Sequence, residues 1–303
     1  MPINFGTSQV QYLQISAAQQ PHASVAHGEA KRNLTIEGFS DVGDVMMKYQ
    51  NGNLSQHFGF NLKYYRAHQV KDYRQAVSHA AGAYLFKPDL EHLHSYQYSA
   101  LTTEVEYEQG SIVDQWTIRF WNCTTEEAAI VKIRFLEKYE EFIEFEVELI
   151  DVPLKEGYGK DVTVNWKLFD GFNANKTFWT DSNGLEMQER RLNYNPSYPW
   201  NAEHKDTQNI SGNFYPVSSA IAIRDNAKKL QATIMNDRAQ AGSADLEPST
   251  IELIQHRRMV QDDNRGPKEI LNETDSSGNG IKVNARYWMQ IFDMKVDQSK
   301  QRE

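Results

Sequence analysis

Two pairs of side chains have the types and spacing that could support hydrolytic chemistry. His92 and His94 form the first pair, and alternate residues on a strand share a face, as ligands of one metal ion would. A zinc site needs a third ligand, usually a histidine or a carboxylate, and no compelling candidate lies near these two in the sequence. The pattern therefore favours a pair of surface histidines without a metal over a zinc site.

Asp262 and Asp263 form the second pair and are the only adjacent aspartates in the chain. A retaining glycosidase holds two carboxyl groups about 5–5.5 Å apart across a sugar, whereas neighbours on a strand point to opposite faces. A bent loop would be needed, and the Asn and Gly that follow supply loop character. We favour the alternative role, in which the aspartates cap a turn and pair with Arg257, Arg258 or Arg265.

The remaining sequence offers no self-contained catalytic arrangement. It has no Gly-x-Ser-x-Gly elbow, and its single cysteine, Cys123, lies in an alternating, partly charged stretch without an evident activating cation. One cysteine also excludes an internal disulfide framework and a thiolate-rich zinc module. We therefore predict no catalytic residue and no metal ligand in this chain.

Aromatic residues point to binding instead. Tyr194, Tyr198 and Trp200 crowd one proline-containing stretch, and apolar rings with polar tips suit the faces of sugars. Such rings also often anchor a long loop onto the edge of a sandwich. Both roles are open at the level of the sequence.

The composition limits the class of protein. The 303 residues carry 32 Lys plus Arg and 41 Asp plus Glu, a formal charge of −9, and 40% of them are hydrophobic. Such a chain can bury a core, and its acidic balance argues against nucleic-acid binding, which depends on neutralising phosphates. No apolar run approaches the roughly 20 residues of a membrane helix. We expect a globular domain with no nucleic-acid partner and no membrane span.

Asn-x-Ser/Thr acceptors are enriched, since random placement of the asparagines would give roughly half as many. This enrichment suggests a secreted or luminal protein, although chance placement would explain any single site. The first residues show no basic segment followed by an apolar one, so no signal peptide is evident and we expect a fragment. The six acceptors are Asn33, Asn53, Asn122, Asn175, Asn209 and Asn272.

Alternating apolar and polar residues predict β-strands. Over 112–121, Ile112, Trp116, Ile118 and Phe120 fall on one face. Residues 126–141 could compete as a helix, but the β-branched residues within them favour a strand. Similar patterns predict strands at 105–108, 130–136, 142–150, 162–169, 219–224, 230–235, 250–255 and 287–292.

Turn signals separate these strands, at 156–157, 182–184 and 276–280. Many strands divided by such turns predict an all-β protein, built as a large antiparallel β-sandwich. Residues 1–32 show no sustained period and are predicted to be a linker or an incomplete lead-in. The sandwich is therefore expected over 33–303, truncated or complete at its C-terminal end.

Five motifs stand out between about residues 80 and 275. They read Gly-Ala-Tyr-Leu-Phe-Lys-Pro at 82–88, Thr-Asp-Ser-Asn-Gly at 180–184, Gly-Asn-Phe-Tyr-Pro-Val at 212–217, Asp-Arg-Ala-Gln-Ala-Gly-Ser at 237–243 and His-Arg-Arg-Met-Val-Gln-Asp-Asp-Asn-Arg-Gly at 256–266. In this order they closely resemble glycoside hydrolase family 38, the class II α-mannosidases. Their wording looks more like the lysosomal branch of that family than the Golgi branch.

The resemblance covers only the C-terminal β-sandwich region of the family, which implies a galactose mutarotase-like super-sandwich. Members of the family begin with an α/β barrel that holds a zinc ion, an aspartate nucleophile and a second carboxylic acid, and a helical bundle follows. The family's zinc-binding His-x-Asp-Pro-Gly-Trp and His-His-Asp segments have no counterpart in this sequence. The resemblance thus implies that zinc belongs to the missing catalytic domain and that this chain binds no cofactor.

Two residues match family positions that line the mannose pocket. They are Tyr84, in the Gly-Ala-Tyr motif, and Arg265, in the Asp-Asp-x-Arg-Gly motif. A phenol can hydrogen-bond a ring hydroxyl, and a guanidinium offers a rigid fork of donors. The alternatives are a buried strand tyrosine for Tyr84 and, for Arg265, an ion pair with one of the two adjacent aspartates. The Asp181, Asn183 and Gly184 positions favour a tight turn over sugar contacts.

The resemblance implies the C-terminal β-sandwich portion of a zinc-dependent, retaining α-mannosidase that hydrolyses terminal α-mannosyl residues of glycoprotein glycans. Its expected partners are mannose-containing glycans and the catalytic barrel and helical bundle of the same enzyme. The chain alone is predicted to be inactive. The alternative is a freestanding carbohydrate-binding or interaction module without hydrolase activity.

Overall fold

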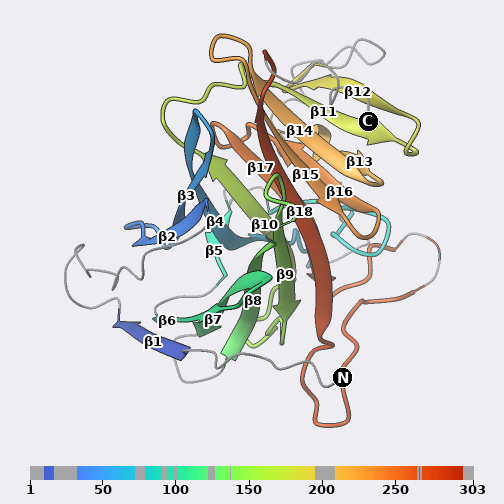
Figure 1. Cartoon of the computed structure of the whole chain (residues 1–303). Coiled ribbons are helices and arrows are strands. Elements are labelled where there is room, and N and C mark those ends of the chain that lie inside the picture. Colours follow the sequence, from blue (N-terminus) through green and yellow to red (C-terminus); the bar gives the residue numbers. More distant parts are fainter. Residues whose placement is uncertain are drawn as a thin grey trace.

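The chain folds into two antiparallel β-sheets that pack face to face, as Figure 1 shows for the computed structural model. The structure describes residues 10–16, 33–71, 79–89, 95–98, 102–121, 127–136, 138–194, 209–264, 266 and 268–295. Within these ranges the regular elements are strands, apart from one 3-10 turn at Ser211–Asn213. The predicted all-β sandwich is therefore confirmed.

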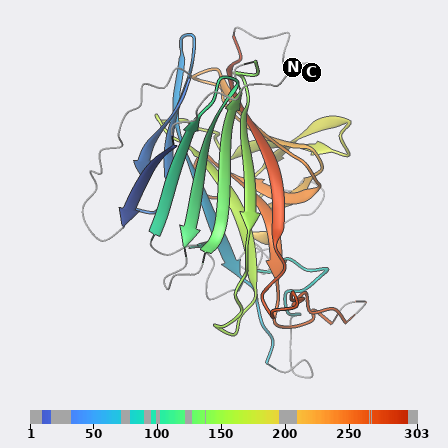
Figure 2. The same ribbon diagram turned by 60° about the horizontal axis from the view of Figure 1, so that its bottom comes forward.

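The larger sheet, sheet A, has ten strands in the order β1-β6-β7-β8-β9-β18-β15-β14-β11-β12. Figure 2 shows the green strands β7 to β9 and the red-orange β18 lying side by side in it. The strands are β1 Val10–Ser16, β6 Thr102–Gln109, β7 Val113–Trp121, β8 Glu127–Leu136, β9 Ile143–Leu149, β11 Thr177–Ser182, β12 Glu186–Arg191, β14 Ala220–Asp225, β15 Leu230–Asn236 and β18 Val283–Asp293.

The smaller sheet, sheet B, has the order β13-β16-β17-β10-β4-β3-β2, and the short β5 also pairs with β4. Its central strands β17, β10 and β4 are buried along almost their whole lengths. The strands are β2 Leu34–Phe39, β3 Val45–Asn51, β4 Leu54–Arg66, β5 Tyr96–Gln97, β10 Lys160–Leu168, β13 Tyr215–Val217, β16 Gln240–Ala244 and β17 Thr250–Arg258.

Each strand expected from alternation is present. Residues 126–141 contain β8 and no helix among the residues described there, as the β-branched positions predicted. One assignment within 112–121 is wrong, because Ile112 precedes β7 and is 66% exposed. The buried Asp114 takes that place on the inward face beside Trp116, Ile118 and Phe120.

Several strands were not predicted. Strands β2, β3 and β4 occupy 34–66, where glycines and mixed polar residues obscure the alternation. Strand β1 lies inside the segment expected to be a linker and pairs with β6 along seven residues, Val10 to Ser16. Backbone pairing therefore gives part of the 1–32 segment an extended structure that its composition does not signal.

An aromatic cluster joins the two sheets at the centre of the core. Trp166 of sheet B lies 5.1 Å from Tyr287 and 5.8 Å from Phe145 of sheet A, measured between ring centroids in edge-to-face geometry. Phe60 stacks on Phe145 at 5.2 Å. All four rings are fully buried, so burial of aromatic surface is a main source of stability between the layers.

A β-bulge interrupts the pairing of β10 with β17. Asp161 pairs with Arg257 and Val162 with His256, but Thr163 pairs with Ile254, so Gln255 is an extra residue on β17. The Gln255 amide nitrogen donates to the carbonyl oxygen of Val147, in sheet A, at 2.8 Å. The bulge thus adds a polar tie between the sheets and sets which face of β17 the following arginines occupy.

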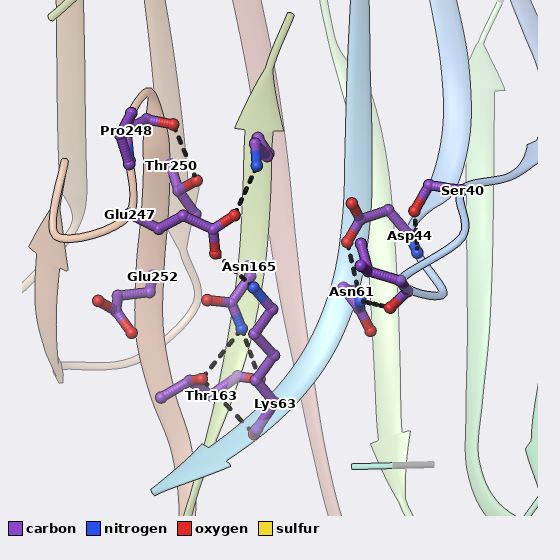
Figure 3. Close-up of polar contacts among 12 residues, drawn as sticks. Ser40, Asp44, Asn61, Lys63, Thr163, Asn165, Glu247, Pro248, Thr250 and Glu252 are labelled. Carbon is purple, nitrogen blue, oxygen red and sulfur yellow. Dashed lines mark hydrogen bonds and ion pairs between the residues drawn. The ribbon is translucent and has the colours of Figure 1, made fainter. Parts of the chain in front are cut away.

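The outer face of sheet B carries polar residues that are nevertheless buried. Figure 3 shows Lys63 on β4 beside Thr163 and Asn165 on β10, and Asn165 donates to the Thr163 hydroxyl at 3.0 Å. Lys63 and Lys167 each contact Glu247, with N–O distances of 2.5 Å. We call this set, together with Tyr65 and Glu252, the polar layer of sheet B.

Among the described residues, no helix is long and apolar enough to cross a membrane.

Candidate functional site

Tyr84 lies at the tip of a tight turn that connects no regular strands. The Gly82 N–H donates to the Leu85 carbonyl at 3.1 Å, and the Leu85 N–H donates back to Gly82 at 3.2 Å. The Tyr84 side chain is 65% exposed. This position contradicts the alternative of a buried strand tyrosine and leaves the phenol available to a ligand.

Arg257, at the end of β17, holds this turn from below. Its two terminal nitrogens donate to the carbonyl oxygens of Gly82 and Leu85 at 2.9 and 3.0 Å. Its third nitrogen, Nε, contacts Asp161 Oδ1 at 2.5 Å. One planar guanidinium therefore joins both ends of the turn to the first residues of β10.

Asp263 holds the same turn from the side. Its Oδ2 atom accepts the Tyr84 N–H at 2.8 Å. A Cβ added at Gly82 would lie 2.6 Å from the Asp263 Cβ and 2.7 Å from its backbone nitrogen, so only glycine fits there. We call Gly82, Arg257, Asp161 and Asp263 the turn bracket.

The second loop of the site, described at 259–264 and 266, lies against the Tyr84 turn. Gln261 exchanges two hydrogen bonds of 2.9 Å with the Val70 backbone, which fixes the loop to the chain beyond β4. Gly266 adopts a φ of +67°, and a Cβ there would lie 3.1 Å from the Tyr84 ring. The two motifs that resembled pocket segments thus meet in space.

Apolar rings form the floor next to the turn. Phe86 packs against Phe214 at 4.7 Å and against Tyr65 at 6.0 Å, measured between ring centroids. The Tyr65 hydroxyl donates to Glu252 Oε2 at 2.8 Å. The site therefore continues directly into the polar layer of sheet B.

Burial controls the acids beneath the site. It raises the pKa of Asp161, and the adjacent Arg257 only partly offsets this effect. Burial likewise raises the pKa of Glu252 to about 7, although Tyr65 and Lys63 favour its charged form. Glu252 is therefore largely protonated in mildly acidic solution, whereas Asp161 has a guanidinium partner at contact distance.

The predicted turn at 181–184 is present and is structural. Asn183 and Gly184 have φ values of +56° and +69°, and with Leu185 they form the three-residue connection from β11 to β12. Asp181 accepts N–H donors from Gly184, Ser219 and Ala220 at 2.9, 2.9 and 3.1 Å. Burial alone would raise the pKa of Asp181, but these donors hold it below its ordinary value.

The other sequence candidates are not gathered at this site. Tyr194 is exposed, and its ring lies 6.0 Å from the Arg191 guanidinium. Arg258 pairs with Asp151 at 3.0 Å. The candidates that lie outside the described residues are His92, His94, Cys123, Tyr198, Trp200 and Arg265.

The described residues contain no group of three or more histidine, cysteine, aspartate or glutamate side chains arranged to hold a metal ion. The donor set that is present consists of one buried acid bound to arginine, one acid bound to a backbone N–H and one exposed phenol. This set suits hydrogen bonding to a neutral polar ligand and not metal coordination.

Sequence reasoning singled out Tyr84 but gave Arg257 and Asp161 no role in holding its turn. Asp161 lies 96 positions from Arg257 and directly before the strand predicted at 162–169, and no local pattern singled it out. Arg257 was one of three arginines offered as partners of the adjacent aspartates, whereas its ion pair joins it to Asp161. The signal that could have found it is the double arginine at 257–258, whose neighbours on a strand must face opposite ways.

Fold and site together define a large β-sandwich domain that presents a rigid, hydrogen-bonding loop at one end. The sequence profile described as the C-terminal domain of glycosyl hydrolases family 38 matches residues 34–265, and the chain therefore belongs to this family as that C-terminal domain. The recognition made from the five motifs is confirmed.

Curated relatives agree with this assignment. The chain is 35% identical to a lysosomal α-mannosidase of Bos taurus over 211 residues, which cover 69% of this chain and 19% of the relative. It is 32% identical to the lysosomal α-mannosidase of Mus musculus over 256 residues, 82% of this chain and 22% of the relative. A probable α-mannosidase of Arabidopsis thaliana is 28% identical over 91% of this chain and 25% of its own length. The chain spans about a fifth to a quarter of the length of these relatives.

Proposed function

We propose that this chain is the C-terminal portion of a zinc-dependent, retaining α-mannosidase that removes terminal α-mannosyl residues from glycoprotein glycans. In this role it forms part of the wall of the mannose pocket and a packing surface for the catalytic barrel and helical bundle. The zinc and the catalytic carboxylates belong to those other parts. Membership of the family and the α-mannosidase names of the relatives support this proposal.

The observation that carries the pocket role is the exposed phenol of Tyr84 on a turn that is fixed at both ends. A phenol both donates and accepts hydrogen bonds, so it can pair with a sugar hydroxyl in either sense. Its backbone is held by charged groups, so little conformational freedom is lost when a ligand binds. Tyr84 therefore has the chemistry and the rigidity of a substrate-binding residue.

Arg265 is proposed as the second substrate-binding residue. It follows Asp263 by two positions and directly precedes Gly266, and both of these residues contact the Tyr84 turn. An arginine next to this contact would offer a guanidinium fork to the same ligand that Tyr84 meets. The proximity of its chain neighbours is what supports the assignment.

We place the protein in the lysosome or elsewhere in the secretory-pathway lumen. The lysosomal names of the mammalian relatives support this, as do the acceptor asparagines that the structure leaves exposed. Asn53, Asn175 and Asn272 are exposed, whereas the Asn33 amide donates to Glu140 at 3.2 Å. Secreted chain should therefore carry N-linked glycans at the three exposed positions, and peptide mass mapping after glycan release would check this.

The test compares the chain alone with an enzyme assembled around it. Residues 1–303 should not turn over a chromogenic α-mannoside in the presence of zinc. Joined to the barrel and helical bundle of the bovine relative, in place of that protein's own matching region, the chain should support turnover. Robust turnover by the chain alone would place the catalytic groups within it and overturn the proposal.

Substitution of Tyr84 tests the pocket role in the assembled enzyme. Tyr84→Phe removes one hydrogen bond to the sugar and should lower kcat/KM by about tenfold. Tyr139→Phe is the matched control, because Tyr139 is a similarly exposed tyrosine in the turn between β8 and β9. Equal kcat/KM values for the two variants would remove Tyr84 from the pocket.

A further inference from the structure

We propose that Arg257 and Asp161 are positioning residues that hold the Tyr84 turn in one conformation for ligand binding. The inference rests on the proposed function only for the identity of the ligand that Tyr84 binds. That Arg257 and Asp161 fix the turn is a statement about this chain, and it can be tested without a substrate.

Arg257 uses each nitrogen of its side chain as a hydrogen-bond donor. All three nitrogens of the guanidinium are engaged, two by the carbonyl oxygens of Gly82 and Leu85 and one by the carboxylate of Asp161. Because the guanidinium is planar, the distance between the two carbonyls is fixed along with the direction of the turn. Lysine at this position would keep the charge but could not hold both carbonyls in one plane.

Burial of the Asp161 carboxylate is unfavourable in free energy. Its side chain is fully buried, and its Oδ2 atom has no hydrogen-bond partner among the described residues. A buried ion pair is often no more stabilising than apolar residues of similar size, so stability alone does not explain why one lies here. Orientation does explain it, because Asp161 fixes Arg257 by its Nε atom and leaves both terminal nitrogens for the turn.

The Tyr84 side chain is exposed, whereas the groups that hold its turn are largely buried. Asp161 and Asp263 are fully buried, and Gly82 is buried against Asp263, whereas the Tyr84 side chain is the exposed part of the assembly. Exposed turn tips are ordinarily mobile. Here the backbone on both sides of Tyr84 is hydrogen-bonded to largely buried charged groups. These bonds limit the directions in which the Tyr84 side chain can point.

The chain supplies a matched control at the next residue. Arg258 also ends β17, is also largely buried and also forms an ion pair, with Asp151 at 3.0 Å. It lies on the opposite face of the strand and donates to the Val152 carbonyl, not to the turn. Arg257→Lys and Arg258→Lys therefore make the same chemical change, but only the first reaches Tyr84.

The first experiment measures amide hydrogen exchange on the full chain at Gly82, Tyr84 and Leu85. Arg257→Lys should speed exchange at these amides about tenfold or more, because hydrogen bonds to a charged group are each worth at least about that factor. Asp161→Asn should act in the same direction, and Arg258→Lys should leave these amides unchanged. Unchanged exchange in Arg257→Lys, or an equal increase in Arg258→Lys, would overturn the proposal.

The second experiment is a double-mutant cycle in the assembled enzyme described above. Arg257→Lys should lower kcat/KM to nearly the level of Tyr84→Phe, and the double variant should be no worse than either, because both act through one contact. Fully additive losses would refute positioning through Tyr84. If Tyr84→Phe has no effect while exchange at the turn still responds to Arg257→Lys, the pocket proposal fails and the positioning of the turn stands.

Discussion

Charged side chains on the outer faces of the two sheets differ in how deeply they are buried. On sheet A, Arg134 reaches across to Glu144 and Glu146 at 2.7 and 2.8 Å, and all three side chains remain partly exposed. On sheet B, Asp161 is fully buried beneath Arg257, and Glu252 is only 5% exposed. The same strand alternation thus produces ion pairs with partly exposed acids on one sheet and fully buried or nearly buried acids on the other.

This difference shows that a polar residue on the outward side of a strand does not imply contact with water. Arg134, Glu144 and Glu146 on sheet A keep part of their hydration, so their ion pairs add less to stability than fully buried ones would. Asp161 and Glu252 on sheet B have lost almost all of it, so each must be matched by a partner or protonated. The turn bracket and the polar layer both include residues of sheet B. The buried acids Asp161 and Glu252 therefore lie next to the candidate site.

The largest expected effect comes from removing one arginine from each face. Arg257→Met leaves Asp161 buried without its partner and should lower the free energy of unfolding by about 3–5 kcal/mol. Arg134→Met, on sheet A, should cost about 1 kcal/mol or less. Urea denaturation of both variants measures the two losses, and equal losses would contradict the contrast between the faces.

The next effect is a dependence of stability on pH that belongs to sheet B. The pKa of Glu252 is raised by burial to about 7 in the folded chain, against 4.5 ordinarily. The folded state therefore holds this proton more tightly, and its contribution to stability is complete below about pH 4.5 and is lost as the pH rises through 7. Between pH 4.5 and 8 the free energy of unfolding of the unmodified chain should fall by about 3 kcal/mol more than that of Glu252→Gln.

A glutamate of sheet A should respond in the opposite direction. Burial alone would raise the pKa of Glu146, but hydrogen bonds from Arg134 and Asn284 hold it below its ordinary value. Its contribution is therefore present above the ordinary pKa and lost as the solution becomes more acidic. Denaturation midpoints of Glu146→Gln and Glu252→Gln across pH should diverge from the unmodified chain at opposite ends, and parallel curves would argue against distinct environments.

The smallest effect is expected at the margin of sheet A. Lys282 approaches Glu148 at 3.7 Å, and its side chain is 62% exposed. Lys282→Met should change the free energy of unfolding by less than about 0.5 kcal/mol, and high salt should reduce even that change. Thermal denaturation at low and high salt would reveal a larger or salt-independent effect, which would mean that this face is less hydrated than we describe.

Strands of sheet A were the easier part of the fold to predict. In β9, Ile143 to Leu149, buried and half-buried residues alternate without a break, because one face meets the core and the other meets water. In β4 the Gly59, Asn61 and Lys63 positions face the covered polar layer, so the sequence lacks the contrast between a wet and a dry face. The alternation signal is weakest where both faces of a strand are buried.

The candidate site was predictable in its exposed tip and not in its support. Tyr84 stands in a motif that can be read locally, whereas its bracket joins residues 82, 161, 257 and 263 from separate parts of the chain. Which arginine of the adjacent pair faces Asp161 depends on pairing across two strands. No local pattern in the sequence carries that information.

The extra residue Gln255 has a consequence for how related chains should be aligned. The pairing before and after the bulge differs by one position, so an unbulged β17 that kept Gln255 would place His256, in place of Arg257, opposite Asp161. A chain that lacks the equivalent of Gln255 would pair regularly and still place its arginine opposite the equivalent of Asp161. A one-residue gap between the equivalents of residues 254 and 256 is therefore compatible with an intact Tyr84 turn, whereas a strand that keeps the extra residue needs the bulge.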